Sequence, residues 1–103
     1  MLRGTLLHQD RTAVYALDGE LDRTNAQALH ERLIDIAGEA EGDHLVLDMS
    51  GLTFIDGPAI GHLIQVAQAL FAKGSRFELV NVPEAPMRVL RVTGLTDYFG
   101  LDA

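Results

Sequence analysis

Apolar and polar positions follow several different periods along the chain, and each change of period marks a boundary between predicted elements. Short apolar runs predict four β-strands, at residues 2–7, 13–17, 44–49 and 76–80. Apolar residues at helical spacing predict three α-helices, within residues 24–37, 58–73 and 83–93. The order β-β-α-β-α-β-α predicts an α/β fold in which helices cover a sheet, with parallel strands wherever a helix joins them.

The same pattern predicts where individual strands end. The first two strands are expected to form a hairpin, and the second ends at Asp18-Gly19, a pair typical of turns. Residues 44–49 show little alternation, which is typical of a central strand covered on both faces. Ser50 is then expected in the turn after this strand, and residues 38–43 are expected to form a loop.

The first helix is expected to begin with a capping box. Thr24 can accept a hydrogen bond from the backbone N–H three residues further on, and Gln27 can reach back to the N–H of Thr24. The apolar residues that follow recur at a spacing that can face a sheet: Ala26, Leu29, Leu33, Ile36 and Ala37.

The start of the second helix is the most informative stretch. Proline fixes its own φ near the helical value and has no N–H, so Pro58 is predicted at the first helical position and Gly57 at the N-cap. Asp56 lies just before them, near unpaired N–H groups and the positive end of the helix dipole. Because Ala59 and Gly61 are small, a partner surface could approach the backbone of this first turn closely.

Composition and charge bound the class of protein. With 103 residues, 48% hydrophobic and 22% charged, the chain is expected to form one globular domain over residues 1–103. No apolar run approaches the roughly 18 residues of a membrane span and no signal-peptide pattern opens the chain, so a cytoplasmic location without membrane insertion is expected. A formal charge of −7 opposes phosphate backbones, so a basic or neutral protein is the expected partner rather than nucleic acid.

No residue pattern predicts an enzyme, a cofactor or a metal site. The chain has no cysteine, no glycine-rich phosphate loop and no nucleophile elbow. Its histidines, at positions 8, 30, 44 and 62, lack metal-binding spacings and are predicted to lie at the surface. Asp48 and Asp56 could form a carboxylate pair like that of a receiver domain, but the early acidic cluster and the late lysine of such a site are absent.

Two segments, taken together with the order of elements, carry a family resemblance. Leu17-Asp18-Gly19-Glu20-Leu21-Asp22 precedes the first helix, and residues 45–56, LVLDMSGLTFID, precede the second. They resemble the STAS domain, the fold of bacterial anti-sigma factor antagonists, over residues 14–95. The resemblance implies a mixed β-sheet with helices packed mainly on one side. It also implies a function, namely binding of an anti-sigma factor, often a GHKL-type serine kinase, so that its sigma factor is released for transcription.

The chain departs from this family at the phosphoacceptor position. The resemblance implies a phosphorylated serine or threonine two residues after the aspartate. Here Asp56 is followed by Gly57, Pro58 and Ala59, so Pro58 occupies that position and offers no hydroxyl. The other nearby hydroxyls are expected to serve turns and caps rather than phosphorylation: Thr24, Ser50 and Thr53.

In similar domains partners dock at the start of the second helix and at the loop before the first. The resemblance therefore implies a contact surface made of Asp22, Arg23, Thr24, Asp56, Gly57, Pro58, Ala59, Ile60, Gly61, His62 and Gln65. On local features alone, Asp56 could serve only to support its helix. Three functions stay open: an antagonist not controlled by phosphorylation at Pro58, an accessory subunit of an ABC-type transport system, and a small-molecule sensor, which Asp56 disfavours by repelling anions. The oligomeric state is not predicted.

Overall fold

The computed structural model describes residues 1–39 and 44–101. Within them the chain forms, in order, β1 (Leu2–Gln9), β2 (Thr12–Leu21), α1 (Ala26–Glu39), β3 (His44–Ile55), α2 (Gly57–Ala72), β4 (Arg76–Val80) and α3 (Glu84–Val92). The predicted order of elements is confirmed. The loop predicted over residues 38–43 begins later than expected, because Gly38 and Glu39 extend α1, and its residues 40–43 lie outside the described part of the chain.

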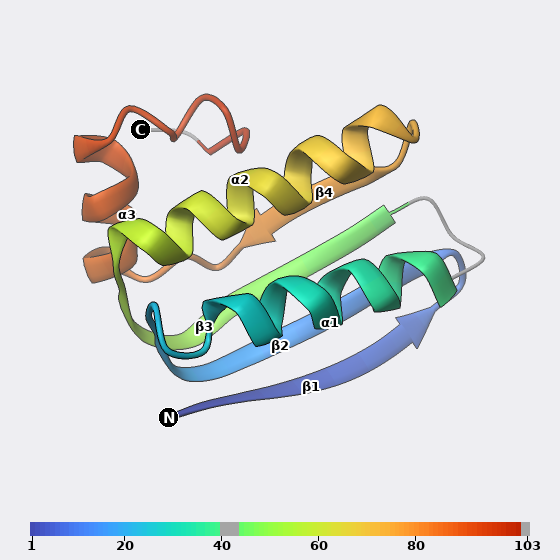
Figure 1. The fold of residues 1–103 in the computed structure, drawn as a ribbon, viewed down its shortest axis with the longest axis horizontal. Helices are drawn as coiled ribbons and strands as arrows, with labels where there is room; N and C mark the ends of the chain where they lie inside the picture. Colours follow the sequence, from blue (N-terminus) through green and yellow to red (C-terminus); the bar gives the residue numbers. More distant parts are fainter. Residues whose placement is uncertain (40–43, 102–103) are drawn as a thin grey trace.

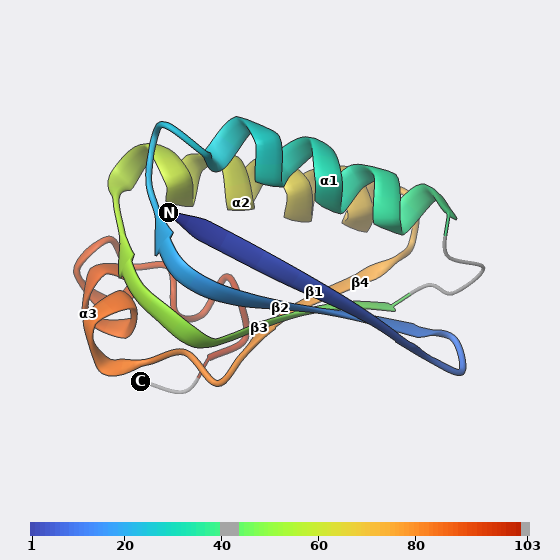
Figure 2. The same ribbon diagram turned by 90° about the horizontal axis from the view of Figure 1, so that it is seen from below.

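The strands form one mixed sheet in the order β1-β2-β3-β4. β1 pairs with β2 antiparallel, whereas β2 with β3 and β3 with β4 are parallel pairs, each joined through a helix. Helices α1 and α2 lie side by side on one face of the sheet, and the shorter α3 lies on the other (Figures 1 and 2). The prediction that the helices pack mainly on one side is therefore confirmed.

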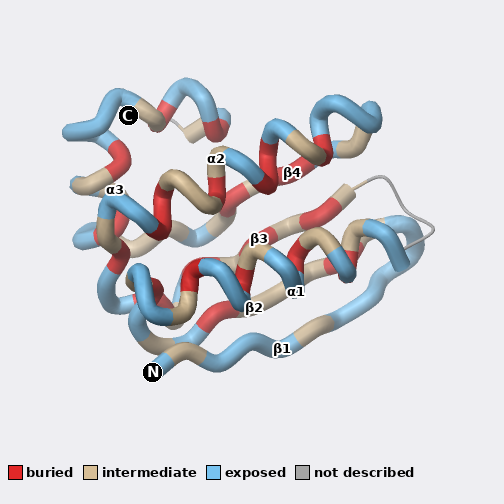
Figure 3. Tube along the Cα trace, viewed as in Figure 1, coloured by how far each residue is buried: buried red, intermediate tan, exposed pale blue. Residues whose placement is uncertain are grey.

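The core lies between the sheet and the α1–α2 layer. Buried positions recur along α1, α2 and the inner strands (Figure 3). Leu33 and Ile36 of α1 and Leu63 of α2 are each buried, at the predicted helical spacing. Burying one such side chain contributes about 1.5–3 kcal/mol. No helix of the described residues combines the length and the apolar character that a membrane span requires.

Strand β3 is central but only one of its faces is fully buried. Leu45, Leu47 and Met49 are buried, whereas Val46 and Asp48 between them are half-buried. The predicted central strand is confirmed, but one of its two faces is covered only in part. Coverage of the second face is partial because only α3 and the chain after it lie there, where Leu90 and Phe99 are buried.

Strand β3 runs six residues beyond its predicted end, because it contains extra residues opposite β2. The register passes from Ala16–Asp48 directly to Asp18–Gly51, and again from Gly19–Leu52 to Glu20–Phe54. Each step places one more residue on β3 than on β2, which is the definition of a β-bulge. Ser50 lies at the first bulge inside β3, so its predicted place in a turn was wrong.

Strand β2 likewise continues through the predicted turn at Asp18-Gly19 and ends at Leu21. Gly19 has a φ of 118°, a backbone conformation that side chains disfavour, and so a turn-like residue sits within a strand. At the bulge opposite, a Cβ on Gly51 would lie 2.7 Å from the Leu17 carbonyl oxygen. The two glycines therefore let β2 and β3 stay paired to their ends.

Candidate functional site

The ends of β2 and β3 bring two loops together at one corner of the molecule. Leu21 pairs with Ile55 as the last residues of the two parallel strands, and both are buried. Asp22 and Asp56 follow them directly, so the loop before α1 and the start of α2 lie next to each other (Figure 1). In parallel sheets this edge, beyond the carboxyl ends of the strands, is where functional residues gather.

Asp56 is the N-cap of α2. Its backbone is extended, with φ −112° and ψ 173°, and its Oδ1 accepts a hydrogen bond of 2.9 Å from the N–H of Ala59. The prediction that Gly57 is the N-cap was therefore wrong by one residue. The Asp56 carboxylate can accept hydrogen bonds from the N–H groups of the first turn, whereas glycine has no side chain with which to accept them. Gly57 and Pro58 are therefore the first two helical residues.

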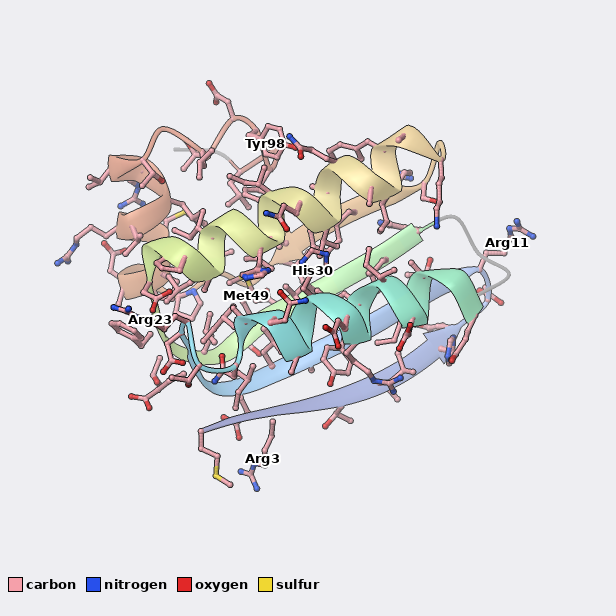
Figure 4. All side chains as sticks on the ribbon, in the orientation of Figure 1. Arg3, Arg11, Arg23, His30, Met49 and Tyr98 are labelled. Atoms are coloured by element: carbon pink, nitrogen blue, oxygen red, sulfur yellow. The ribbon has the colours of Figure 1, made fainter. Side chains whose placement is uncertain are left out.

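The second carboxylate oxygen of Asp56 joins the two loops. Asp56 Oδ2 accepts a hydrogen bond of 3.0 Å from the backbone N–H of Arg23, 33 residues earlier in the chain. Figure 4 shows Arg23 at the same end of the molecule as the start of α2. One side chain thus caps a helix and fixes the position of the neighbouring loop.

The loop before α1 is held by a turn around Asp22. Asp22 Oδ1 accepts hydrogen bonds from both the N–H and the hydroxyl of Thr24, and these bonds, led by that of the hydroxyl, lower the pKa of the Asp22 carboxyl. Thr24 is therefore a donor to Asp22 rather than the acceptor of a capping box. Gln27 bonds to Glu31 instead of reaching back, so the predicted capping box was wrong.

Asn25 completes this loop and was missed from the sequence. Its Oδ1 accepts from the N–H of Asp22 at 3.0 Å, and its Nδ2 donates to the carbonyl of Glu20 at 2.9 Å. The sequence feature that could have indicated this role is the position of Asn25, directly before the first buried helical residue, Ala26. Asparagine side chains at such positions often form hydrogen bonds with nearby backbone groups. Thr53 also serves the backbone, but within the sheet rather than in the predicted turn or cap, because its hydroxyl on β3 donates to the Gly19 carbonyl on β2.

The predicted contact residues differ in how far they reach the surface. Arg23, Thr24, Gly57, Pro58 and Gln65 are exposed. Asp22, Asp56, Gly61 and His62 are half-buried. Ala59 and Ile60 are only 0% and 3% exposed, because they face the core beneath the first turn of α2. We call the exposed residues Arg23, Thr24, Gly57 and Pro58 the corner surface.

Asp48 and Asp56 do not form a carboxylate pair. Asp48 Oδ1 instead accepts from the N–H of Ser50 at 3.0 Å and from Nδ2 of Asn81 at 3.2 Å. Seven residues of β3 lie between Asp48 and Asp56, and at the ordinary rise of a strand this places the two residues roughly 25 Å apart. The Ser50 bond first, and then the Asn81 bond, lower the pKa of Asp48 against the opposing effect of partial burial.

The Asp48→Asn variant is expected to lose less unfolding free energy at acid pH than the native chain does. Because the folded-state pKa of Asp48 lies below its ordinary value of 3.8, its ionised form stabilises the fold above that pH. This contribution is lost as the pH falls from there through the lowered pKa. Urea denaturation between about pH 5 and pH 2 should show a steeper loss of unfolding free energy for the native chain than for the variant. Parallel curves would contradict the role of these bonds; Asp35→Asn, at an exposed position of α1, is the matched control.

The histidines are not all at the surface. His8 is exposed, as predicted, but His30 and His62 are half-buried and contact each other between α1 and α2, and half-buried His44 contacts Glu78. The prediction of surface positions was therefore wrong for these three. Their spacing along the chain gave no sign of it, because His30 and His62 belong to different helices.

Comparison with known proteins identifies the family to which the chain belongs. The family model of the STAS domain matches residues 5–103, and the chain belongs to the STAS domain family. The chain is 26% identical over 85 residues to the anti-sigma-B factor antagonist of Bacillus subtilis (strain 168), which covers 82% of this chain and 76% of the relative.

Solved structures agree with this family membership. A crystal structure of an anti-sigma factor antagonist from Mycobacterium paratuberculosis has 25% identity and a TM-score of 0.86, and the match covers 98% of this chain and 85% of that one. The anti-sigma factor antagonist SpoIIAA in its unphosphorylated form shares the fold, with 22% identity, a TM-score of 0.79, and coverage of 93% and 84%. The predicted STAS-type mixed sheet is thus confirmed.

Proposed function

We propose that this chain is an anti-sigma factor antagonist-like regulator, which binds an anti-sigma factor and thereby controls sigma-factor-dependent transcription. The similar proteins from Bacillus subtilis and Mycobacterium paratuberculosis are both named as antagonists of this kind. The partner is an anti-sigma factor of the GHKL-type serine kinase class. Residues 1–103 act as a single STAS domain in the cytoplasm, and the chain works by binding, without a reaction or cofactor of its own.

The observation that carries the proposal is the corner surface. Its four residues come from two loops, yet the Arg23–Asp56 hydrogen bond holds them in one arrangement. Gly57 and Pro58 add almost no side-chain bulk, and Pro58 restricts the backbone at the second helical position. A surface whose shape is fixed before binding loses little conformational entropy on association, which favours affinity.

Pro58 gives this regulator a distinct mode of control. SpoIIAA has been solved in unphosphorylated and phosphorylated forms. In this chain neither Gly57 nor Pro58 has a hydroxyl to receive phosphate. We infer that its binding is constitutive with respect to phosphorylation at this position. The alternative of an ABC-type transport subunit has no comparable support.

Gly57→Trp is expected to weaken binding of the cognate anti-sigma factor by tenfold or more. We expect the fold to tolerate the substitution, because Gly57 is exposed and a Cβ there meets nothing within 4 Å. The indole would cover the corner surface and keep the partner away. Isothermal titration calorimetry measures the effect; a tenfold loss corresponds to about 1.4 kcal/mol.

Gly38→Trp is the matched control for this experiment. Gly38 is also exposed, also lies in a helix and also has open space around its Cβ, but it lies at the far end of α1. We expect its affinity to equal that of the native chain. If Gly57→Trp binds the partner as tightly as Gly38→Trp and the native chain do, the partner docks elsewhere. If the native chain itself does not bind an anti-sigma factor, the proposed function is refuted.

A further inference from the structure

Two histidine rings meet between the helices that cover the sheet. His30 on α1 and His62 on α2 place their Nδ1 atoms 3.0 Å apart, and their ring centroids are 5.3 Å apart at an interplanar angle of 75°. Both side chains are half-buried. Figure 4 shows His30 in the space between the two helices. Neither ring belongs to the corner surface or to the cluster of buried core residues.

This geometry suits a metal ion. A zinc-bound imidazole nitrogen lies about 2.0–2.1 Å from the ion, so two such nitrogens at one ion are roughly 3–3.5 Å apart. The Nδ1 separation of 3.0 Å falls at the lower end of that range. The two helix backbones are fixed by buried neighbours, Leu29 and Leu33 on α1 and Leu63 and Val66 on α2, so the rings are held close before any ion arrives.

We propose that His30 and His62 form a two-histidine site for a divalent transition metal such as Zn²⁺ or Cu²⁺, bound through both Nδ1 atoms. In the metal-free protein one Nδ1–H donates to the other Nδ1. Metal binding requires both Nδ1 lone pairs, so the ring that donated its Nδ1 proton carries its proton on Nε2 instead. Imidazole nitrogen favours these ions over Mg²⁺ and Ca²⁺, which prefer oxygen ligands.

Water completes the coordination. The described residues contain no cluster of three or more His, Asp or Glu side chains that could enclose an ion. The site is therefore open: two protein ligands leave two positions of a tetrahedral zinc ion to water, one more than at a catalytic site with three protein ligands. Its two ligands lie 32 residues apart in sequence and on different helices, so an ion would link α1 to α2 in the folded state only.

The test is the thermal unfolding of the native chain with and without added Zn²⁺. An ion that binds the folded chain in preference to the unfolded one raises Tm, and we expect a rise of roughly 4 °C or more at saturating metal, reversed by EDTA. His30→Asn and His62→Asn should each abolish the rise. His8→Asn, at an exposed position of β1, should keep it and is the matched control.

A second measurement needs no variant. The electron paramagnetic resonance spectrum of the native chain with one equivalent of Cu²⁺ should show coupling to two imidazole nitrogens. The proposal is overturned if Zn²⁺ leaves the Tm of the native chain unchanged, if the rise persists in both histidine variants, or if the Cu²⁺ spectrum shows fewer than two nitrogens. These results are independent of whether the chain binds an anti-sigma factor.

Discussion

Pro58→Ser is expected to make the start of α2 a substrate for the anti-sigma serine kinase that we propose as the partner. Position 58 is exposed and lies two residues after Asp56, where the family resemblance implies a phosphoacceptor. A phosphate adds about −1.5 to −2 charges at neutral pH, next to the Asp56 carboxylate and in the middle of the corner surface. The phosphorylated variant should therefore bind the anti-sigma factor at least tenfold more weakly than the native chain.

Tandem mass spectrometry of proteolytic peptides, after incubation with the kinase and ATP, measures this switch and locates the phosphate. The native chain should gain no phosphate within residues 56–62, and the Pro58→Ser variant should gain one. Gly57→Ser is the matched control, because it places an exposed hydroxyl one residue out of register and should remain unmodified. Phosphate on residues 56–62 of the native chain would contradict the mode of control that we propose, as would a Pro58→Ser variant that binds the kinase and stays unmodified.

Asp56→Ala is expected to destabilise the fold by about 2 kcal/mol, the sum of a lost N-cap and a second lost hydrogen bond. The N–H groups of Ala59 and Arg23 both lose their acceptor. For a domain of this size such a loss lowers Tm by roughly 10 °C. Binding should weaken as well, because no other hydrogen bond among the described residues joins the Arg23 loop to the start of α2.

Two further variants separate this effect from the loss of a charge. Asp56→Asn keeps a side-chain oxygen that can cap the helix, so it should recover about half of the lost stability. Asp18→Ala removes an aspartate whose partner, Arg3, is highly exposed, and such surface pairs contribute about 0–1 kcal/mol. If Asp56→Ala costs no more than Asp18→Ala in urea denaturation, the two hydrogen bonds of Asp56 do not support the corner.

The order of the elements could be predicted because apolar spacing separates strands from helices. Leu29, Leu33 and Ile36 are buried along α1 at the spacing that predicted the helix. The α2 boundary was predicted to within one residue, because proline is confined to the first turn of a helix. The STAS resemblance came from the two segments before α1 and α2, which end at Asp22 and Asp56 and lead directly into the corner surface.

The strand ends could not be predicted, because bulges break the local pattern. Two extra residues in β3 interrupt its alternation after Met49, and Gly19 in β2 has the composition of a turn. Their pairing depends on the neighbouring strand, which is distant in sequence. The side-chain partners at the corner share this property, since Asp56 bonds to Arg23 and His62 contacts His30 across more than thirty residues.

The hydrogen bond from Arg23 to Asp56 has a practical consequence. Arg23 lies in an exposed loop, where a backbone amide ordinarily exchanges its hydrogen with solvent quickly, yet this amide is tied to a helix cap from another part of the chain. The exchange rate of that single proton therefore follows the joint opening of both loops. It offers a spectroscopic probe of the corner that requires no label and no substitution.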